Sequence, residues 1–522
     1  MEISRFKYLI APIIGLLITF PILAVIFYFI FFQEDVSEIS QVENIFNYTK
    51  TTIVLLVGVT FFASILGIVT SYLSARYNYF GSKFFALIFI LPLAFPAYVL
   101  AYSYVGFFEF RGLMSQMFSN TDLKIDIMNI YGAIFIFTIA MYPYIYVLGR
   151  VSFASVSKTV VELVQINKLT STKAFFQVYL PLSYPAIFAG LILALMETIS
   201  DYGTVFYLGV ETFSLGVFKS WFGYGDISGA IYVSVVLLVF VFSILLIEYK
   251  IRKKFRFASS THSFERAAKI DLKGKQNFFA FLVSFIISSI AFFIPLLVLI
   301  YWTILDFGEW EWESLELLAN TLKLNFISSL FIISLSFIVV YMLRFYPTKP
   351  SVFIHKMSIL GYSIPGAVVA LGLLVIANFI DNSLQMALLN GSFIVIIFAY
   401  TTRYFATSIG SVENGFSKID SNLDDASKIF GTSESSNLFK IYFPLLKPYL
   451  LSGFLILYID IAKELPATLL LRPFNYDTLA IRIYELSTNE MLFKVGFPSL
   501  ILVSTTAVAV ILLNSKIIRR RK

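Results

Sequence analysis

The sequence predicts an all-α integral membrane protein with about 12 transmembrane helices, arranged as two parallel six-helix repeats. Composition is the first observation behind this fold class: 58% of the 522 residues are hydrophobic, 14% are charged, and the mean hydropathy is +0.84. A water-soluble chain of this length could not bury so much apolar surface. The second observation is a series of long apolar stretches, and the third is one loop pattern that occurs twice.

The spans follow from the length that a bilayer requires, which is about 20 mostly apolar residues per helix. The first candidate, 8–32, has an apolar run of about 25 residues, which is too long for the core of a cleaved signal peptide. We therefore interpret it as a retained helix. The predicted spans are 8–32, 52–74, 84–107, 129–152, 184–207, 228–248, 277–303, 321–343, 352–378, 385–409, 448–471 and 495–517.

The distribution of basic residues sets the predicted orientation, because Lys and Arg accumulate in cytoplasmic loops. Most of the 39 Lys and Arg residues fall on the side of the N-terminus, many of them in 249–276. Segment 403–447, which begins with Arg403, is counted on the same side. The opposite side is acidic, and 304–320 contains acidic but no basic residues. Both termini are therefore expected in the cytoplasm.

The chain divides into a first repeat, 1–250, and a second repeat, 277–522, joined by 251–276. We interpret the basic joining segment as a solvated linker, with a site for lipid headgroups as the alternative. Segment 91–96 (LPLAFP) matches 360–365 (LGYSIP), and each repeat has six spans of the same order and sidedness. An axis along the membrane normal would relate such repeats, so a pathway between the two halves is expected.

One cytoplasmic loop in each repeat, within 155–183 and 412–447, carries the same pattern of an acidic residue, a turn and a pair of prolines. The pattern resembles the coupling loop of ABC-importer permeases, which contacts a separate ATPase. Glycine suits the turn because it accepts positive φ, and proline suits the first turn of the following span. In the first copy Lys168 replaces the glycine. The residues expected to contact the ATPase are Glu162, Phe175, Pro181, Asp425, Gly431 and Pro444.

Predicted spans five and eleven together contain five charged residues. Glu197 and Asp201 lie in span five, and a shift of 263 residues carries them onto Asp460 and Glu464 in span eleven, beside Lys463. A charge at the bilayer centre costs about 2.5–3.5 kcal/mol, so we expect these side chains to face the other half or a wet cavity. They could be structural partners of Lys463, a path for a cation or its ligand, or a contact for the solute-delivering protein. Metal ligands cannot be assigned.

The residues around these acids resemble ferric-iron ABC permeases. The relevant stretches are 197–205 (ETISDYGTV) with 209–213 (GVETF), and 463–474 (KELPATLLLRPF) with 477–480 (DTLA). The resemblance implies a type I ABC importer permease in the bacterial inner membrane, with both halves fused in one chain. It also implies two copies of a cytoplasmic ATPase, which carries ATP and Mg, and a periplasmic iron-binding protein. No cofactor is expected on this chain, and fused thiamine and phosphonate permeases are near relatives.

Other function classes find little support in the sequence. The absence of Cys excludes disulfides and thiolate sites, and two His are too few for a histidine metal centre. No constellation of catalytic residues suggests an enzyme, and the clustered basic residues do not indicate a nucleic-acid partner. An ion-coupled secondary transporter would also place carboxylates in the membrane. The paired coupling loops argue against it, because such a transporter has no ATPase to contact.

Overall fold

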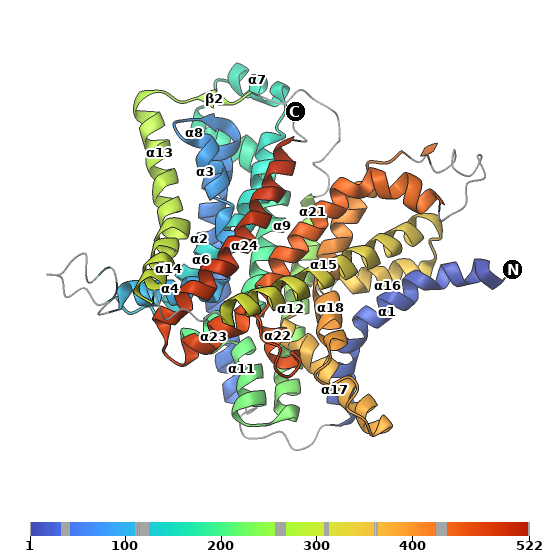
Figure 1. The fold of residues 1–522 in the computed structure, drawn as a ribbon. Helices are drawn as coiled ribbons and strands as arrows, with labels where there is room; N and C mark the ends of the chain where they lie inside the picture. Colours follow the sequence, from blue (N-terminus) through green and yellow to red (C-terminus); the bar gives the residue numbers. More distant parts are fainter. Residues whose placement is uncertain are drawn as a thin grey trace.

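The computed structural model describes residues 2–32, 42–109, 112, 114, 125–255, 268–306, 313–359, 361, 364–420, 422–423 and 436–519. Helices dominate this part of the chain (Figure 1). Within it, 11 helices are long and apolar enough to cross a membrane, or 12 if one bent pair counts as a span. The predicted all-α membrane fold is therefore confirmed.

The helices of the first repeat are α1 (Glu2–Phe31), α2 (Val42–Arg76), α3 (Ser82–Ile88), η2 (Leu91–Ala94), α4 (Ala97–Phe108), α6 (Ile130–Ala154), α7 (Lys158–Ile166), α8 (Ser171–Ala174), η3 (Phe175–Tyr179), α9 (Leu180–Ser200), α10 (Gly203–Tyr207), α11 (Phe213–Phe218), η4 (Lys219–Gly223) and α12 (Ile227–Phe255). Those of the second repeat are α13 (Gly274–Ser288), η6 (Ser289–Phe293), α14 (Ile294–Leu305), α15 (Glu313–Phe345), α16 (Lys349–Ile359), α17 (Gly366–Leu384), α18 (Phe393–Phe416), η8 (Asn437–Tyr442), α21 (Phe443–Ala462), α22 (Pro466–Leu471), α23 (Leu479–Thr488) and α24 (Leu492–Arg519).

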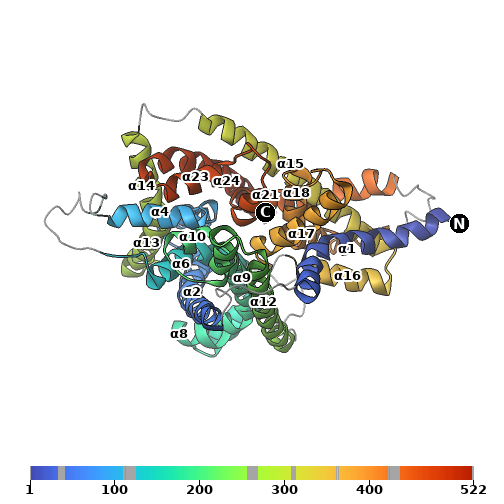
Figure 2. The same cartoon turned by 90° about the horizontal axis from the view of Figure 1, so that it is seen from below.

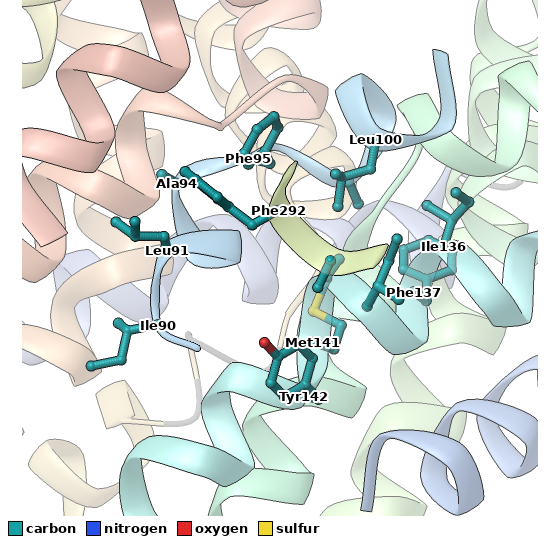
Figure 3. Close-up of a cluster of buried hydrophobic side chains, with 14 of the residues drawn as sticks. Ile90, Leu91, Ala94, Phe95, Leu100, Ile136, Phe137, Met141, Tyr142 and Phe292 are labelled. Atoms are coloured by element: carbon teal, nitrogen blue, oxygen red, sulfur yellow. The ribbon is translucent and has the colours of Figure 1, made fainter. Parts of the chain in front are cut away.

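Span three is broken rather than continuous, which corrects the prediction of one helix over 84–107. The helical segments Ser82–Ala94 and Ala97–Phe108 meet at an angle of 99°. Phe95 is extended, as expected for a residue that precedes proline, because the ring of Pro96 clashes with a helical neighbour. Figure 3 shows Phe95 among buried apolar side chains, and its ring lies 5.7 Å from that of Phe292 in η6.

The matching segment of the second repeat is also interrupted. The span predicted at 352–378 is wrong, because α16 ends at Ile359 and the apolar helix α17 begins only after Pro365. Pro96 and Pro365 occupy the same place, immediately before α4 and α17, with φ of −60° and −57°. The sequence match between the two segments thus marks a helix start in each repeat.

The first helix of each repeat packs against the other repeat. Helix α1 lies beside α16 and α17 in both views (Figures 1 and 2), and α13 lies against α2 and α3. The α1–α17 contact is close: a Cβ on Gly372 would lie 2.1 Å from the carbonyl oxygen of Pro21. At the second contact the Tyr79 and Ser284 hydroxyls are 2.7 Å apart. The two halves of the sequence are therefore intertwined in the fold.

The expected solvated linker is structured at both of its described ends. Helix α12 continues to Phe255, and β2 (Ile270–Asp271) pairs in parallel with β1 (Tyr77–Asn78) after span two. Lys269 Nζ donates to the Ser74 carbonyl at 2.6 Å, which fixes the segment before β2. Residues 256–267 lie outside the described part of the chain. The joining segment is thus anchored on the first repeat.

Candidate functional site

Spans five and eleven both break at the second of their two intramembrane acids, Asp201 and Glu464. Helix α9 ends at Ser200 and α10 restarts at Gly203, whereas α21 ends at Ala462 and α22 restarts at Pro466. These breaks replace the continuous spans predicted to residues 207 and 471. Asp201 Oδ1 accepts the Thr204 amide at 2.8 Å, and Glu464 Oε1 accepts the Ala467 amide at 3.0 Å. The second acid of each pair thus caps the next short helix, because a carboxylate satisfies its free amide.

Arg403, in the middle of α18, connects the acids of the two halves. Its side chain is 5% exposed; Nη1 bonds Glu464 Oε2, and Nη2 lies 3.6 Å from Glu197 Oε2. The Tyr404 hydroxyl donates to the same Glu464 oxygen at 2.7 Å. The assignment of Arg403 to a cytoplasmic loop is therefore wrong, and it is a site residue that sequence reasoning missed. The predicted span 385–409 already contained Arg403, and a basic residue within a span could have indicated a role in the charged site.

Lys463 pairs with the other acid of its own span. Its Nζ lies 3.7 Å from Asp460 Oδ1, and both side chains are largely buried. The sequence left open whether Lys463 would neutralise Asp460 or Glu464. The geometry assigns it to Asp460, since Glu464 is held by Arg403 and Tyr404.

The charged residues line one small cavity between the halves, with a volume of about 60 Å³. All five predicted path residues, Glu197, Asp201, Asp460, Lys463 and Glu464, are in its wall together with Arg403. The N-termini of α4 and α17 also reach the cluster: Pro96 and Ala97 line the cavity, and a Cβ on Gly366 would lie 2.5 Å from Glu464 Oε1. These positive helix ends stabilise the carboxylates.

A second, larger cavity of about 550 Å³ adjoins the charged one. The two share Leu93, Tyr144, Asp460 and Lys463 in their walls. Most of the larger cavity is apolar, and it extends to Glu248 near the end of α12 and to Asn514 near the end of α24. The described structure thus contains two adjacent cavities, one charged and one mostly apolar, which together are the candidate path.

The repeat shift of 263 residues also shows where the two halves differ. It pairs Arg403 with Ala140, Tyr404 with Met141, and Lys463 with Ser200, and all six residues line the charged cavity. The carboxylates are therefore duplicated, whereas both basic residues belong to the second half.

The first coupling loop keeps its tight turn without a glycine. Lys168, the residue at the glycine position, has a φ of +49°, and the Leu169 amide donates to the Val164 carbonyl at 3.2 Å. Glu162 lies on the exposed face of α7, and Phe175 begins η3. In the second loop Asp425 and Gly431 lie outside the described residues.

Each coupling loop enters its span through one wide π-helical turn. These turns, η3 and η8, precede Pro181 and Pro444, which stand in the first turns of α9 and α21. Proline has no amide hydrogen to close a normal helical turn, so a wider turn is accommodated there. The ring of Tyr179 lies 6.0 Å from Tyr72 in α2, and the ring of Tyr442 lies 5.8 Å from Tyr341 in α15. Equivalent aromatic contacts thus join each loop to its repeat.

Comparison with known proteins identifies the family of this chain. The model of the family described as "Binding-protein-dependent transport system inner membrane component" matches residues 63–256 and 344–517. The chain belongs to this family. The matched segments include both coupling loops and every charged residue of the cavity, but neither α1 nor α13. This permease therefore carries the family's unit twice, and the exchanged first helices lie outside it.

Individual relatives are named for several solutes. The chain is 24% identical over 523 residues to the Fe(3+)-transport system permease protein FbpB 2 of Haemophilus influenzae, and 97% of each chain is covered. PhnV of Salmonella typhimurium, named for 2-aminoethylphosphonate transport, is 26% identical over 37% of this permease and 70% of its own length. The molybdate/tungstate transport system permease protein WtpB of Methanocaldococcus jannaschii is 24% identical over 41% and 89%. The match to FbpB 2 extends over both repeats.

No preformed metal centre is evident in the site. Within the described residues, no group of three or more His, Cys, Asp or Glu is placed to hold a metal ion. The acids of the cavity are instead engaged with Arg403, Lys463 and helix amides.

Proposed function

We propose that this permease imports ferric iron, driven by ATP hydrolysis on a partner subunit, and that the solute passes between its two halves. The observation that carries the proposal is the charged cavity lined by both repeats. Four carboxylates face two basic side chains there, so the formal charge of the lining is negative. A negative passage raises the local concentration of cations and repels oxyanions.

The same features favour ferric iron over the other solutes considered. Carboxylate and phenol oxygens are hard ligands, which suit a hard cation. The similarity to FbpB 2 over nearly the whole chain supports the same substrate. Phosphonate and molybdate are anions and would meet the carboxylates unfavourably. Thiamine is a cation, so the negative charge of the cavity does not distinguish it from ferric iron as the substrate.

Energy would enter through the coupling loops. Two copies of a cytoplasmic ATPase, which bind ATP and Mg²⁺, would dock on the loops that carry Glu162 and Asp425. The aromatic contacts Tyr179–Tyr72 and Tyr442–Tyr341 support this role, because they give each loop a packed connection to a long span. A displacement of a loop would then reach α2 or α15 as a rigid movement.

The proposed orientation places both termini and both coupling loops in the cytoplasm. A periplasmic binding protein would then deliver the solute at the opposite face, near the short helices α10 and α22. A reporter fused near residue 262 should be active in the cytoplasm, and one near residue 312 in the periplasm. Basic residues around 262 and acidic residues around 312 are the reason. The reverse result at either position would contradict this topology.

Transport by the reconstituted complex tests the proposed function. The permease, its ATPase and its binding protein would be placed in liposomes, and uptake of radioactive ferric iron, thiamine and phosphonate compared with and without ATP. We expect iron uptake that requires ATP and is insensitive to dissipation of ion gradients. ATP-dependent uptake of thiamine alone would show that thiamine, and not ferric iron, is the substrate. Uptake driven by an ion gradient without ATP would refute the importer mechanism itself.

A further inference from the structure

The equivalent acids of the two repeats have different hydrogen-bond partners in the charged cavity. Glu464 is sealed: its side chain is 2% exposed, and it accepts hydrogen bonds from Arg403, Tyr404 and the Ala467 amide. Asp201 is its counterpart in the first repeat, and it also accepts a helix amide, that of Thr204. The positions equivalent to Arg403 and Tyr404 are Ala140 and Met141, whose side chains donate no hydrogen bonds.

The neighbouring acid follows the same asymmetry. Glu197 is 20% exposed, whereas its counterpart Asp460 is 10% exposed and lies beside Lys463 on its own helix. The residue of the first repeat that corresponds to Lys463 is Ser200, which carries no charge. A basic residue of the second half, Arg403, reaches the first half across the interface and lies 3.6 Å from Glu197.

A buried hydroxyl on the first-half side adds an independent observation. Tyr98, in the first turn of α4, lines the charged cavity and is only 2% exposed. Its hydroxyl has no hydrogen-bond partner among the described residues. Burying a hydroxyl without a partner costs about 1–3 kcal/mol, so the Tyr98 oxygen, in the wall of the cavity, can gain a partner when a ligand enters it.

We propose that Glu197, Asp201 and Tyr98 form a transient binding site for a hard multivalent cation on the first-half side of the cavity. The inference rests on the proposed function and specifies where the cation pauses. The cavity of about 60 Å³ can hold an ion with a few water molecules. Two carboxylates and one phenol give few protein ligands, and such a weak site suits passage because the cation must also leave.

Arg403 has a defined part in this arrangement. It stays bonded to Glu464, while its weaker contact to Glu197 at 3.6 Å is the one that an arriving cation replaces. The second-half acids then serve to hold Arg403 and Lys463 in place, and the first-half acids serve the cation. The duplicated carboxylates thus have two different tasks, set by two basic residues that occur in one repeat only.

Terbium(III), a hard trivalent cation that luminesces on binding, is a suitable probe. The intact complex in lipid nanodiscs would be titrated with terbium as wild type and with Glu197→Gln, Asp201→Asn or Tyr98→Phe. We expect the affinity for terbium to fall about tenfold in Glu197→Gln and in Asp201→Asn, because each variant loses one charged ligand. In Tyr98→Phe the affinity should fall severalfold. Tyr102→Phe is the matched control, since Tyr102 is also buried on α4 but does not line the cavity.

Iron uptake by the same variants separates this inference from the proposed function. The inference predicts a raised KM for iron in Tyr98→Phe, with normal abundance, and wild-type uptake in Tyr102→Phe. If the wild-type complex moves iron but Tyr98→Phe and Asp201→Asn match the control in terbium affinity and uptake, the site is refuted and the function stands. If Asp201→Asn fails to fold, Tyr98→Phe alone decides. Absence of iron uptake by the wild type would overturn both.

Discussion

Replacing Arg403 by methionine should remove the link between the two halves and destabilise the whole permease. The substitution keeps a long side chain but leaves Glu464, which is 2% exposed, without its guanidinium partner. It also removes the contact from Arg403 to Glu197 at 3.6 Å. Breaking a buried ion pair from one side costs about 3–5 kcal/mol, because the remaining charge stays buried. The double variant Arg403→Met/Glu464→Gln should recover most of this loss.

The assay is equilibrium unfolding of the purified permease in detergent, analysed as a double-mutant cycle. We expect a coupling free energy of several kcal/mol between Arg403 and Glu464. Arg482→Met is the matched control: its Nη1 lies 4.0 Å from Glu485 Oε2 in a partly exposed pair, so its loss should cost less than about 1 kcal/mol. Equal stability of Arg403→Met and Arg482→Met would refute the view that this buried pair holds the cluster together.

Three further predictions concern the other parts of the mechanism. Lys168→Gly should stabilise the first coupling loop by about 1 kcal/mol, because Lys168 has a φ of +49°. Slower proteolysis of the loop would show this gain. The control Lys173→Gly lies in a helical turn and should destabilise the loop instead. Asp460→Asn should lower abundance by leaving Lys463 unpaired, and Lys463→Met should restore it; unchanged abundance in the single variant would contradict the pairing. Gly431→Pro should abolish uptake while membrane insertion is kept, since proline cannot take positive φ; normal uptake would show that no such turn is needed.

The positions of the helices were largely predictable from the sequence, and so was the location of the acidic pairs. Hydrophobic length and the repeat shift are properties of the linear chain, and they placed Glu197, Asp201, Asp460 and Glu464 in equivalent spans. The breaks after Phe95 and Ser200 were missed, although Pro96 was a visible signal for the first. An apolar stretch does not reveal whether its helix bends, because the free-energy cost of a bend is offset by packing against helices distant in the sequence.

The sequence by itself determined the membrane fold and the internal repeat, because each depends on local hydrophobicity or regular spacing. Only the tertiary structure decided that Arg403 belongs to the charged cluster and that Lys463 takes Asp460 rather than Glu464. It also decided that α1 and α13 exchange between the halves. These features depend on which helix faces meet. Contacts between residues far apart in the chain set those faces, and their charges can be satisfied only once the helices have packed.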